Sequence, residues 1–219
     1  VCRRREARPL SQRMADLPPD RVTAGGAPFM KVGLDYFGPL LVKRGRGREK
    51  RYGCLFTCLV TRAVHIEVAH SLDTDSFLNA LYRFVARRGL PELIRSDNGR
   101  NFVGADKELR ALLELWNQGR IQQGLAQRGI QWLFNPPDAS HRGGVWERQI
   151  RTVRRVLAGL TREQILSDEA LRTLLTIAEG IINDRPLTPA SDDPADLQVL
   201  TPNHLLILRV ASLPGRDFG

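Results

Sequence analysis

Residues Phe29–Asp35 read FMKVGLD, an alternating and largely apolar run that ends in a carboxylate. Such alternation is typical of a β-strand. A basic turn with interspersed glycines is predicted at Lys43–Arg51, and two more β-rich runs follow at Tyr52–Thr61 and Ala63–Ala69. The three runs predict an antiparallel meander. We interpret the arginines of the turn as a solvated hairpin tip, with contact to phosphate as the alternative.

The next part of the chain alternates between helix and strand patterns. Four stretches are predicted in chain order: a helix from Asp73 or Thr74 to Arg88, a strand at Glu92–Ser96, helical segments over Gly104–Trp116 and on to Arg128, and a strand at Ile130–Phe134. This order predicts an α/β fold with a mixed five-stranded sheet flanked by helices.

The C-terminal half is mainly helical in pattern. A mobile loop is predicted at Asp138–Gly144, followed by a long helix and a last helix at Asp168–Asn183. Apolar residues of the long helix recur at steps of four and three, which predicts one buried stripe: Trp146, Ile150, Val153, Leu157 and Leu160. The predicted outward stripe carries an acid and three arginines: Glu147, Arg151, Arg154 and Arg155. The stretch Pro189–Pro202 is loop-like and acidic.

The composition excludes several classes of protein. The chain has 219 residues, of which 42% are hydrophobic and 26% charged, so it holds enough apolar material for one sizeable core and is not a disordered chain. No apolar run approaches the roughly 18 residues of a membrane-spanning helix, and no signal peptide is visible. We expect an intracellular protein. Because the sequence begins with Val1, we expect it to be a segment of a longer polypeptide.

The charge balance predicts a polyanionic partner. Lys and Arg total 33 against 24 Asp and Glu, which gives a formal charge of +9. Such an excess suits the phosphates of nucleic acid, although a membrane surface or a ribosomal neighbour would fit charge alone. Aromatic residues are only 6% and are not interleaved with basic ones, which favours duplex DNA over a single strand. Cys54 and Cys58 lie in a predicted strand and are interpreted as buried, reduced thiols.

Three acids stand at positions suited to metal binding. Asp35 ends the first strand, Asp97 follows the fourth, and Glu147 lies on the outward stripe of the long helix. A charge at the end of a central strand is costly unless it is compensated. Mg²⁺ prefers carboxylate oxygens, and three acids around two ions about 4 Å apart form a phosphoryl-transfer site.

These acids lie within segments that carry a family resemblance. Gly33–Leu40 (GLDYFGPL), Ser96–Gly99 (SDNG) and His141–Arg148 (HRGGVWER) resemble the three signature segments of retroelement integrase catalytic cores, closest to the BEL/Pao long-terminal-repeat retrotransposons. The resemblance runs from about residue 14 to 206. It includes Asn183–Thr188 (NDRPLT) and Leu200–His204 (LTPNH), which resemble the stretch that follows the core in that group.

The resemblance implies a ribonuclease H-like fold with Asp35, Asp97 and Glu147 as the catalytic, metal-binding residues. It implies two Mg²⁺ or Mn²⁺ ions and an integrase-type polynucleotidyl transferase that processes retroelement DNA 3′ ends and joins them to target DNA. It also implies three parts: residues 1–28 as a linker from an incomplete N-terminal zinc module, 29–188 as the catalytic core and 189–219 as a C-terminal extension. Cys2 falls where the last zinc ligand of that module would lie, but the other ligands are absent, so we expect no zinc.

Two further features bear on the resemblance. The 49 residues between Asp97 and Glu147 match the longer BEL/Pao type, because retroviral integrases have a shorter spacer. Arg100 stands where the family has a small hydroxyl residue, and its guanidinium either contacts DNA phosphate or pairs with Asp97.

DNA contacts are expected next to the acids. The basic residues Arg151, Arg154 and Arg155 resemble those of the integrase helix that grips the element's DNA end, with a solvated helix face as the alternative. Further contacts are expected from the segments that surround the other two motifs: Asn98, Arg100, His141 and Arg142. For Asn98 a simple turn, and for His141 an exposed histidine without a role, remain alternatives.

The remaining expectations concern assembly and location. His65, in a predicted strand, is interpreted as a cap on a sheet face in preference to a metal ligand. Trp116 and Trp132 are interpreted as core or interface anchors, and we expect a homodimer or higher multimer on double-stranded DNA, with no membrane contact. The resemblance implies action in the nucleus after a cytoplasmic virus-like particle stage.

Two rival functions remain open from the sequence. A domesticated or decayed integrase-derived module would bind DNA without turnover, although the three intact acids argue against it. An ordinary ribonuclease H-like nuclease would cleave without joining, and the segments around Glu147 and His204 disfavour it.

Overall fold

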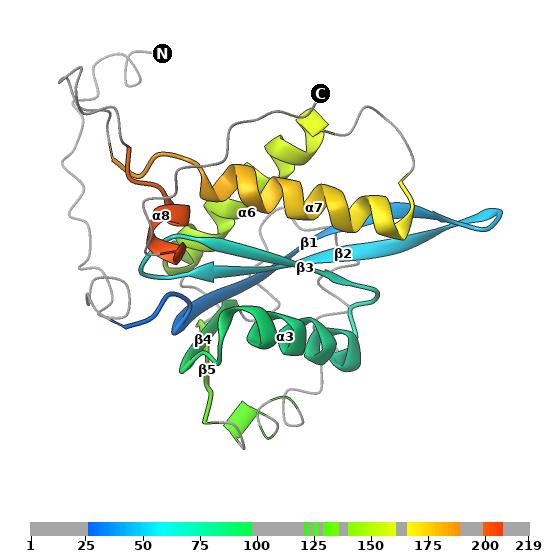
Figure 1. The fold of residues 1–219 in the computed structure, drawn as a ribbon. Coiled ribbons are helices and arrows are strands. Elements are labelled where there is room, and N and C mark those ends of the chain that lie inside the picture. The colour runs from blue at the N-terminus through cyan, green and yellow to red at the C-terminus, as the bar shows by residue number, and fades with distance from the viewer. Residues whose placement is uncertain are drawn as a thin grey trace, which may run out of the picture.

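The computed structural model describes residues 26–97, 121, 123, 125, 126, 129–135, 140–160, 166–188 and 199–207. Within them, five strands form one sheet in the order β3-β2-β1-β4-β5 (Figure 1). Their bounds are β1 Lys31–Arg44, β2 Gly47–Cys58, β3 Val64–Ala69, β4 Leu93–Asp97 and β5 Gln131–Asn135. The first three strands are antiparallel neighbours, while β4 runs parallel to both β1 and β5. The predicted meander and mixed five-stranded sheet are confirmed.

The basic turn predicted at Lys43–Arg51 is wrong in extent. β1 continues to Arg44 and β2 begins at Gly47, so that only two residues form the turn. Gly45 adopts a φ of 59° in that turn, a conformation that glycine takes at no steric cost. The strands extend because most of their charged side chains point into solvent, where they do not oppose pairing. β2 also ends at Cys58, three residues earlier than predicted.

Two helices have bounds that match the predictions, because their ends carry strong local signals. In α3, Thr74–Arg88, the Asp73 side chain caps the first turn by accepting a hydrogen bond from the Ser76 N–H at 2.7 Å. Gly89, with a φ of 92°, ends it. Helix α7, Asp168–Asn183, begins after Ser167, which accepts from the Ala170 N–H.

The other two helices differ from the expectations. Helix α6, Ser140–Leu160, includes residues 140–144, which were predicted to be loop. Each residue added to a formed helix gains a backbone hydrogen bond, which offsets the poor helix propensity of Gly143 and Gly144. Helix α8, Pro202–Ile207, lies at the end of the segment predicted as a loop-like tail and was not predicted. The helices predicted over 104–128 lie almost wholly outside the described residues.

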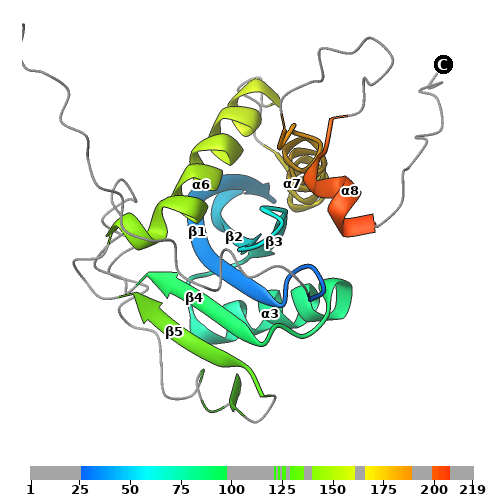
Figure 2. The same cartoon turned by 90° about the vertical axis from the view of Figure 1, so that its left-hand side faces the viewer.

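The helices cover the two faces of the sheet. α3 packs on one face, and α6 and α7 pack on the other (Figures 1 and 2). The α3-side core includes Tyr36, Phe56 and Phe84, and the rings of the last two stack with centroids 4.2 Å apart. The α6-side core includes Phe37 and Val153. The predicted buried stripe of α6 therefore holds, except that Leu160 is 38% exposed at the end of the helix.

Side chains of α7 and α3 close the outer edge of β3. The Asn183 side chain accepts from the Val64 N–H and donates to the Val64 carbonyl, both at 2.8 Å. Glu179 accepts from the Ile66 N–H at 2.8 Å, and Arg83 of α3 donates to the Val68 carbonyl. The edge peptide groups of Val64, Ile66 and Val68 are thus bonded to side chains.

Three smaller predictions can be assessed. Cys54 and Cys58 are buried free thiols, as interpreted. Trp132 is a core residue, because it is 8% exposed and packs against Phe77; Trp116 lies outside the described residues. None of the described helices is sufficiently long and apolar to cross a membrane.

Candidate active site at the β1, β4 and α6 junction

The sheet register brings Asp35 and Asp97 to neighbouring positions. In the parallel pair of β1 and β4, Leu34 lies opposite Ser96. Asp35 and Asp97 are the next residues of the two strands, and Asp97 is the last residue of β4. Two carboxylate-bearing positions therefore stand side by side where β4 ends.

The Asp35 side chain is buried on the α6 side of the sheet. Asp35 is 3% exposed, and its Oδ1 accepts a hydrogen bond from the Tyr36 N–H at 2.8 Å. Successive side chains of a strand point to opposite faces. Gly33 and Phe37 both face α6, so Asp35, midway between them, does so too.

Helix α6 is held against β1 by a close contact. A Cβ added to Gly33 would lie 2.4 Å from Cε3 of Trp146, a side chain that is fully buried. Only glycine allows the indole to approach the strand this closely. Further along α6, toward its C-terminus, Val153 belongs to the same core cluster as Phe37. Helix α6 therefore runs along β1 from Gly33 toward Phe37 (Figure 2).

This path carries Glu147 to the neighbourhood of Asp35. Glu147 directly follows Trp146, which lies against Gly33, and precedes Val153, which belongs to the same core cluster as Phe37. The Glu147 side chain is half-buried. The structure thus brings the predicted acids of β1 and α6 to one region, next to the end of β4.

Among the described side chains, no group of three His, Cys, Asp or Glu residues is gathered closely enough to hold a metal ion. The Asp97 side chain lies outside the described side chains. The structure gives the position of its backbone at the end of β4, next to Asp35.

The residues predicted to contact DNA fall into two groups. Arg151, Arg154 and Arg155 are exposed on α6, on the C-terminal side of Glu147. Asn98 and Arg100 lie outside the described residues. His141 and Arg142 belong to α6 by their backbones, but their side chains are outside the description.

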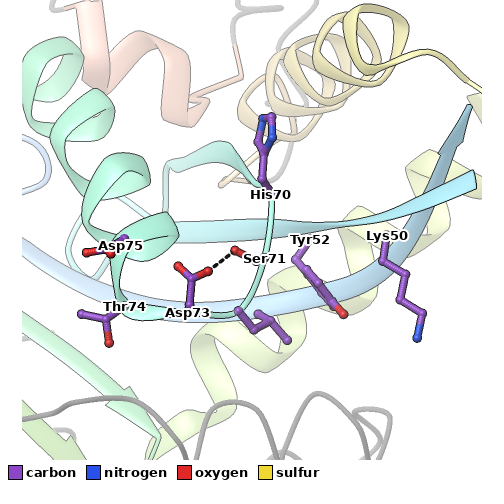
Figure 3. A pocket seen from close by; sticks show the side chains of 8 residues that line it. Lys50, Tyr52, His70, Ser71, Asp73, Thr74 and Asp75 are labelled. Carbon is purple, nitrogen blue, oxygen red and sulfur yellow. Dashed lines mark hydrogen bonds between the residues drawn. The ribbon is translucent and has the colours of Figure 1, made fainter. Parts of the chain in front are cut away.

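A hollow of about 510 Å³ lies elsewhere, at the N-terminal end of α3 (Figure 3). Its polar side chains are largely used to cap the helix: Ser71 donates to Asp73, and Asp73 accepts from Ser76. The Ser71 hydroxyl and the Ser76 N–H hold the pKa of Asp73 below its ordinary value. Tyr52, which lines this hollow, belongs to the α3-side core, whereas Asp35 faces α6. The hollow is therefore separate from the acid site.

A buried ionic cluster, missed from the sequence, joins β3 to both helix layers. His65 contacts Glu67 at 3.0 Å and Glu179 at 3.2 Å, and it is 2% exposed. Burial alone lowers the pKa of His65, but hydrogen bonds to Glu179 and Glu67 outweigh it and raise the pKa above its ordinary value. Arg83 pairs with Glu67, and Arg88 pairs with Glu179. His65 was interpreted only as a cap on a sheet face. Its contacts with Glu67 and Glu179 also link the sheet to the helices through ion pairs.

Two features of the region gave little sequence signal. The role of Gly33 depends on a residue 113 positions away, and no local pattern indicates it. The basic stretch 43–51 was interpreted as a turn because of its charges and glycines, although most of it lies in β1 and β2.

Comparison with solved structures identifies the fold. The chain has the ribonuclease H-like α/β fold of retroviral integrase catalytic cores. It is similar to the HTLV-2 integrase catalytic core domain solved in complex with magnesium in a trimeric form, with a TM-score of 0.52 and 15% identity over 83% of this chain and 99% of that one. It is also similar to a chain of the simian T-cell lymphotropic virus intasome solved with the PP2A regulatory subunit B56 gamma, with a TM-score of 0.56 and 15% identity over 93% of this chain.

The chain spans 63% of the length of that intasome chain. No family model matches the sequence, and neither does any curated protein.

Proposed function

We propose that this chain is the catalytic core of an integrase-type polynucleotidyl transferase of a retroelement, which processes DNA 3′ ends and joins them to target DNA. One observation carries the proposal. The register of β1 and β4 sets Asp35 beside Asp97, and the contact of Trp146 with Gly33 brings Glu147 to the same end of the sheet. The resemblance of the motif segments to those of the BEL/Pao elements, and the 49 residues between Asp97 and Glu147, support that group as the source.

The donor set fits two divalent cations. Asp35 is a carboxylate buried in a central strand, where a bound cation offsets the free energy needed to remove its charge from water. Oxygen ligands of this kind suit Mg²⁺ or Mn²⁺. Asp35, Asp97 and Glu147 would hold the ions. The ions would supply Lewis-acid stabilisation of the attacking and leaving oxygens in an in-line phosphoryl transfer.

The protein's own contribution is to position the DNA. Exposed arginines at 151, 154 and 155 lie on the helix that carries Glu147, and guanidinium groups suit phosphate oxygens. We place further contacts at Asn98, Arg100, His141 and Arg142. The rigid strand and the packed helix keep the three acids in place while the arginines bind the backbone.

We place the catalytic core at residues 29–188, between a linker at 1–28 and an extension at 189–219. The partners we propose are double-stranded DNA and further copies of the same chain, as a homodimer or higher multimer, and we propose action in the nucleus after a stage in a cytoplasmic particle.

Strand transfer and disintegration on branched DNA, with Mg²⁺ or Mn²⁺, test this function. We expect joined products from the wild type and their loss in Asp97→Asn, because the amide removes a negative metal ligand. Glu169→Gln, at an exposed position on α7, is the matched control and should keep activity. Cleavage without joining would indicate a nuclease, and metal-independent binding without products would indicate a DNA-binding module; either result contradicts the proposal.

A further inference from the structure

The β1–β2 hairpin projects beyond the body of the protein. Residues 41–50, here called the hairpin arm, extend past the end of α7 (Figure 1). The arm is rich in cations and carries one acid. Its exposed basic residues are Lys43, Arg44, Arg46, Arg48 and Lys50, and its acid is Glu49.

The charges on one face of the arm are neutralised. Arg44 pairs with Glu49 at 3.0 Å. At the root of the same face, Arg51 pairs with Glu49 and with Asp168 of α7. The two cations of this face thus have acidic partners.

The opposite face of the arm holds two cations that face each other. Lys43 on β1 lies directly opposite Arg48 on β2, and Leu41 lies opposite Lys50. In the described part of the chain, neither Lys43 nor Arg48 forms an ion pair. Like charges placed directly opposite each other on paired strands destabilise the pair. We call this surface, Leu41, Lys43 and Arg48, the open face.

The arm is braced at its root, so that the open face is held in a fixed direction. The Lys43 N–H donates to the Leu166 carbonyl at 2.8 Å, and Val42 forms a bridge with Leu166. Arg51 donates two hydrogen bonds to the Asp168 carboxylate. A solvated, incidental loop would not need this anchorage, and a local conflict of like charges is typical of a functional surface.

We propose that the open face of the hairpin arm is a second binding surface for the phosphate backbone of duplex DNA, apart from the arginines of α6. The inference rests on the proposed function for the class of partner. The open face points away from the α6 side of the sheet, because Leu40 and Val42, which alternate with Leu41 and Lys43, pack in the α6-side core. It therefore contacts a stretch of DNA other than the one at Asp35. A phosphate-bearing partner relieves the repulsion between Lys43 and Arg48 and releases counterions. Its ammonium and guanidinium groups suit phosphate oxygens, and contacts to phosphate carry no sequence information.

The test measures binding to plain duplex DNA. For Lys43→Gln/Arg48→Gln, we expect weaker binding. The slope of log K against log salt should fall by about 1.8, which is about 0.9 for each of the two phosphates that the variant no longer neutralises. Fluorescence anisotropy over a salt series measures both quantities.

Arg172→Gln is the control, compared with Lys43→Gln and Arg48→Gln singly, since it removes one positive charge from an exposed position on α7. An equal weakening in this control would overturn the proposal. A greater effect on binding to phosphatidylserine vesicles than to duplex DNA would also overturn it and would identify a membrane surface as the partner. Urea unfolding verifies the fold of the variant, which should be at least as stable because a like-charge pair is removed.

The two proposals fail separately. If the wild type binds duplex DNA through the arm but forms no joined product with metal, the proposed polynucleotidyl transferase function is contradicted while the proposed binding surface on the arm is retained. If joining depends on Asp97 but the arm variant binds all substrates as the wild type does, only the arm proposal is overturned.

Discussion

Trp146 fills the space that any side chain at Gly33 would need. The indole approaches the β1 backbone so closely that a Cβ at Gly33 would lie 2.4 Å from Cε3. This contact sets the position of α6 along β1 and therefore the position of Glu147 relative to Asp35. A packing contact that involves no acid thus determines how the proposed metal site is assembled.

Gly33→Ala should destabilise the protein and impair the site. The added methyl group cannot be accommodated without moving Trp146, and overpacking of a core costs about 1–3 kcal/mol. Urea unfolding measures this loss, and the joining assay should show a lower rate because α6 is displaced. Gly180→Ala is the control: no atom lies within 4 Å of its Cβ in α7, so a gain of about 0.5–1 kcal/mol is expected. Equal behaviour of the two variants would refute the packing argument.

Under the proposed function, divalent metal should stabilise the wild type against unfolding, because a site formed by Asp35, Asp97 and Glu147 would exist only in the folded chain. At a free Mg²⁺ concentration about 100 times the dissociation constant, the gain is about 2.7 kcal/mol. Asp35→Asn should lose most of it, whereas Glu169→Gln should retain it. Unfolding curves with and without Mg²⁺ provide the measurement, which needs no DNA. A metal-dependent gain that survives in Asp35→Asn would place the ion elsewhere.

The His65 cluster should make stability depend on pH in two windows. The pKa of His65 is raised above 6.5, so its contribution is complete below that pH and is lost as the pH rises through the folded value. For Glu67 and Glu179, burial raises the pKa, but bonds to His65 and to the arginines outweigh it, and the net shift is downward. Their contribution is present above about pH 4.5 and is lost as the pH falls through the lowered values.

The loss of stability at higher pH reports on His65 more specifically than the loss at low pH reports on any one carboxylate. As the pH rises from about 6.5 through the raised pKa of His65, the free energy of unfolding should fall, with a slope of at most about 1.4 kcal/mol per pH unit. His65→Gln should abolish this slope. His70 acts in the opposite direction, because burial and the nearby Arg51 lower its pKa; the comparison is therefore best made in a His70→Gln background. A slope unchanged by His65→Gln would assign it to another group.

Arg51→Lys should loosen the root of the hairpin arm. The Arg51 side chain is 4% exposed and donates from Nε and Nη2 to the two oxygens of Asp168, at 2.7 and 3.0 Å. A lysine cannot form this forked pair. We expect a loss of about 1.5–3 kcal/mol, the range for hydrogen bonds to charged groups. Arg44→Lys, the same change at a side chain 65% exposed, should cost less than about 0.5 kcal/mol. Similar losses in both variants would show that the Arg51–Asp168 pair contributes no more to the free energy of unfolding than the exposed pair of Arg44 does.

The elements that the sequence predicted well are those with local signals. The ends of α3 and α7 follow from Asp73 and Ser167, whose side chains cap the first turns. The acids of the site could be named from motifs, but their meeting depends on sheet register and on the fit of Trp146 to Gly33, which are contacts between distant parts of the chain.

The errors have the same origin. Residues 43–51 look like a turn because they are charged, yet cross-strand pairing and the anchorage of Arg51 keep most of them in strands. Residues 140–144 look like a loop because of their glycines, yet helix α6 extends through them. Local propensity was outweighed by tertiary structure in both places.

The way in which α7 lines β3 limits how copies of this protein can associate. Exposed edge strands invite other chains to add a strand and so promote aggregation. Here Asn183, Glu179 and Arg83 already bond the outward peptide groups of Val64, Ile66 and Val68. A second copy could add a strand along residues 64–68 only by displacing these side chains from the peptide groups that they bond, so β3 is a poor edge for continuing the sheet from one copy to another.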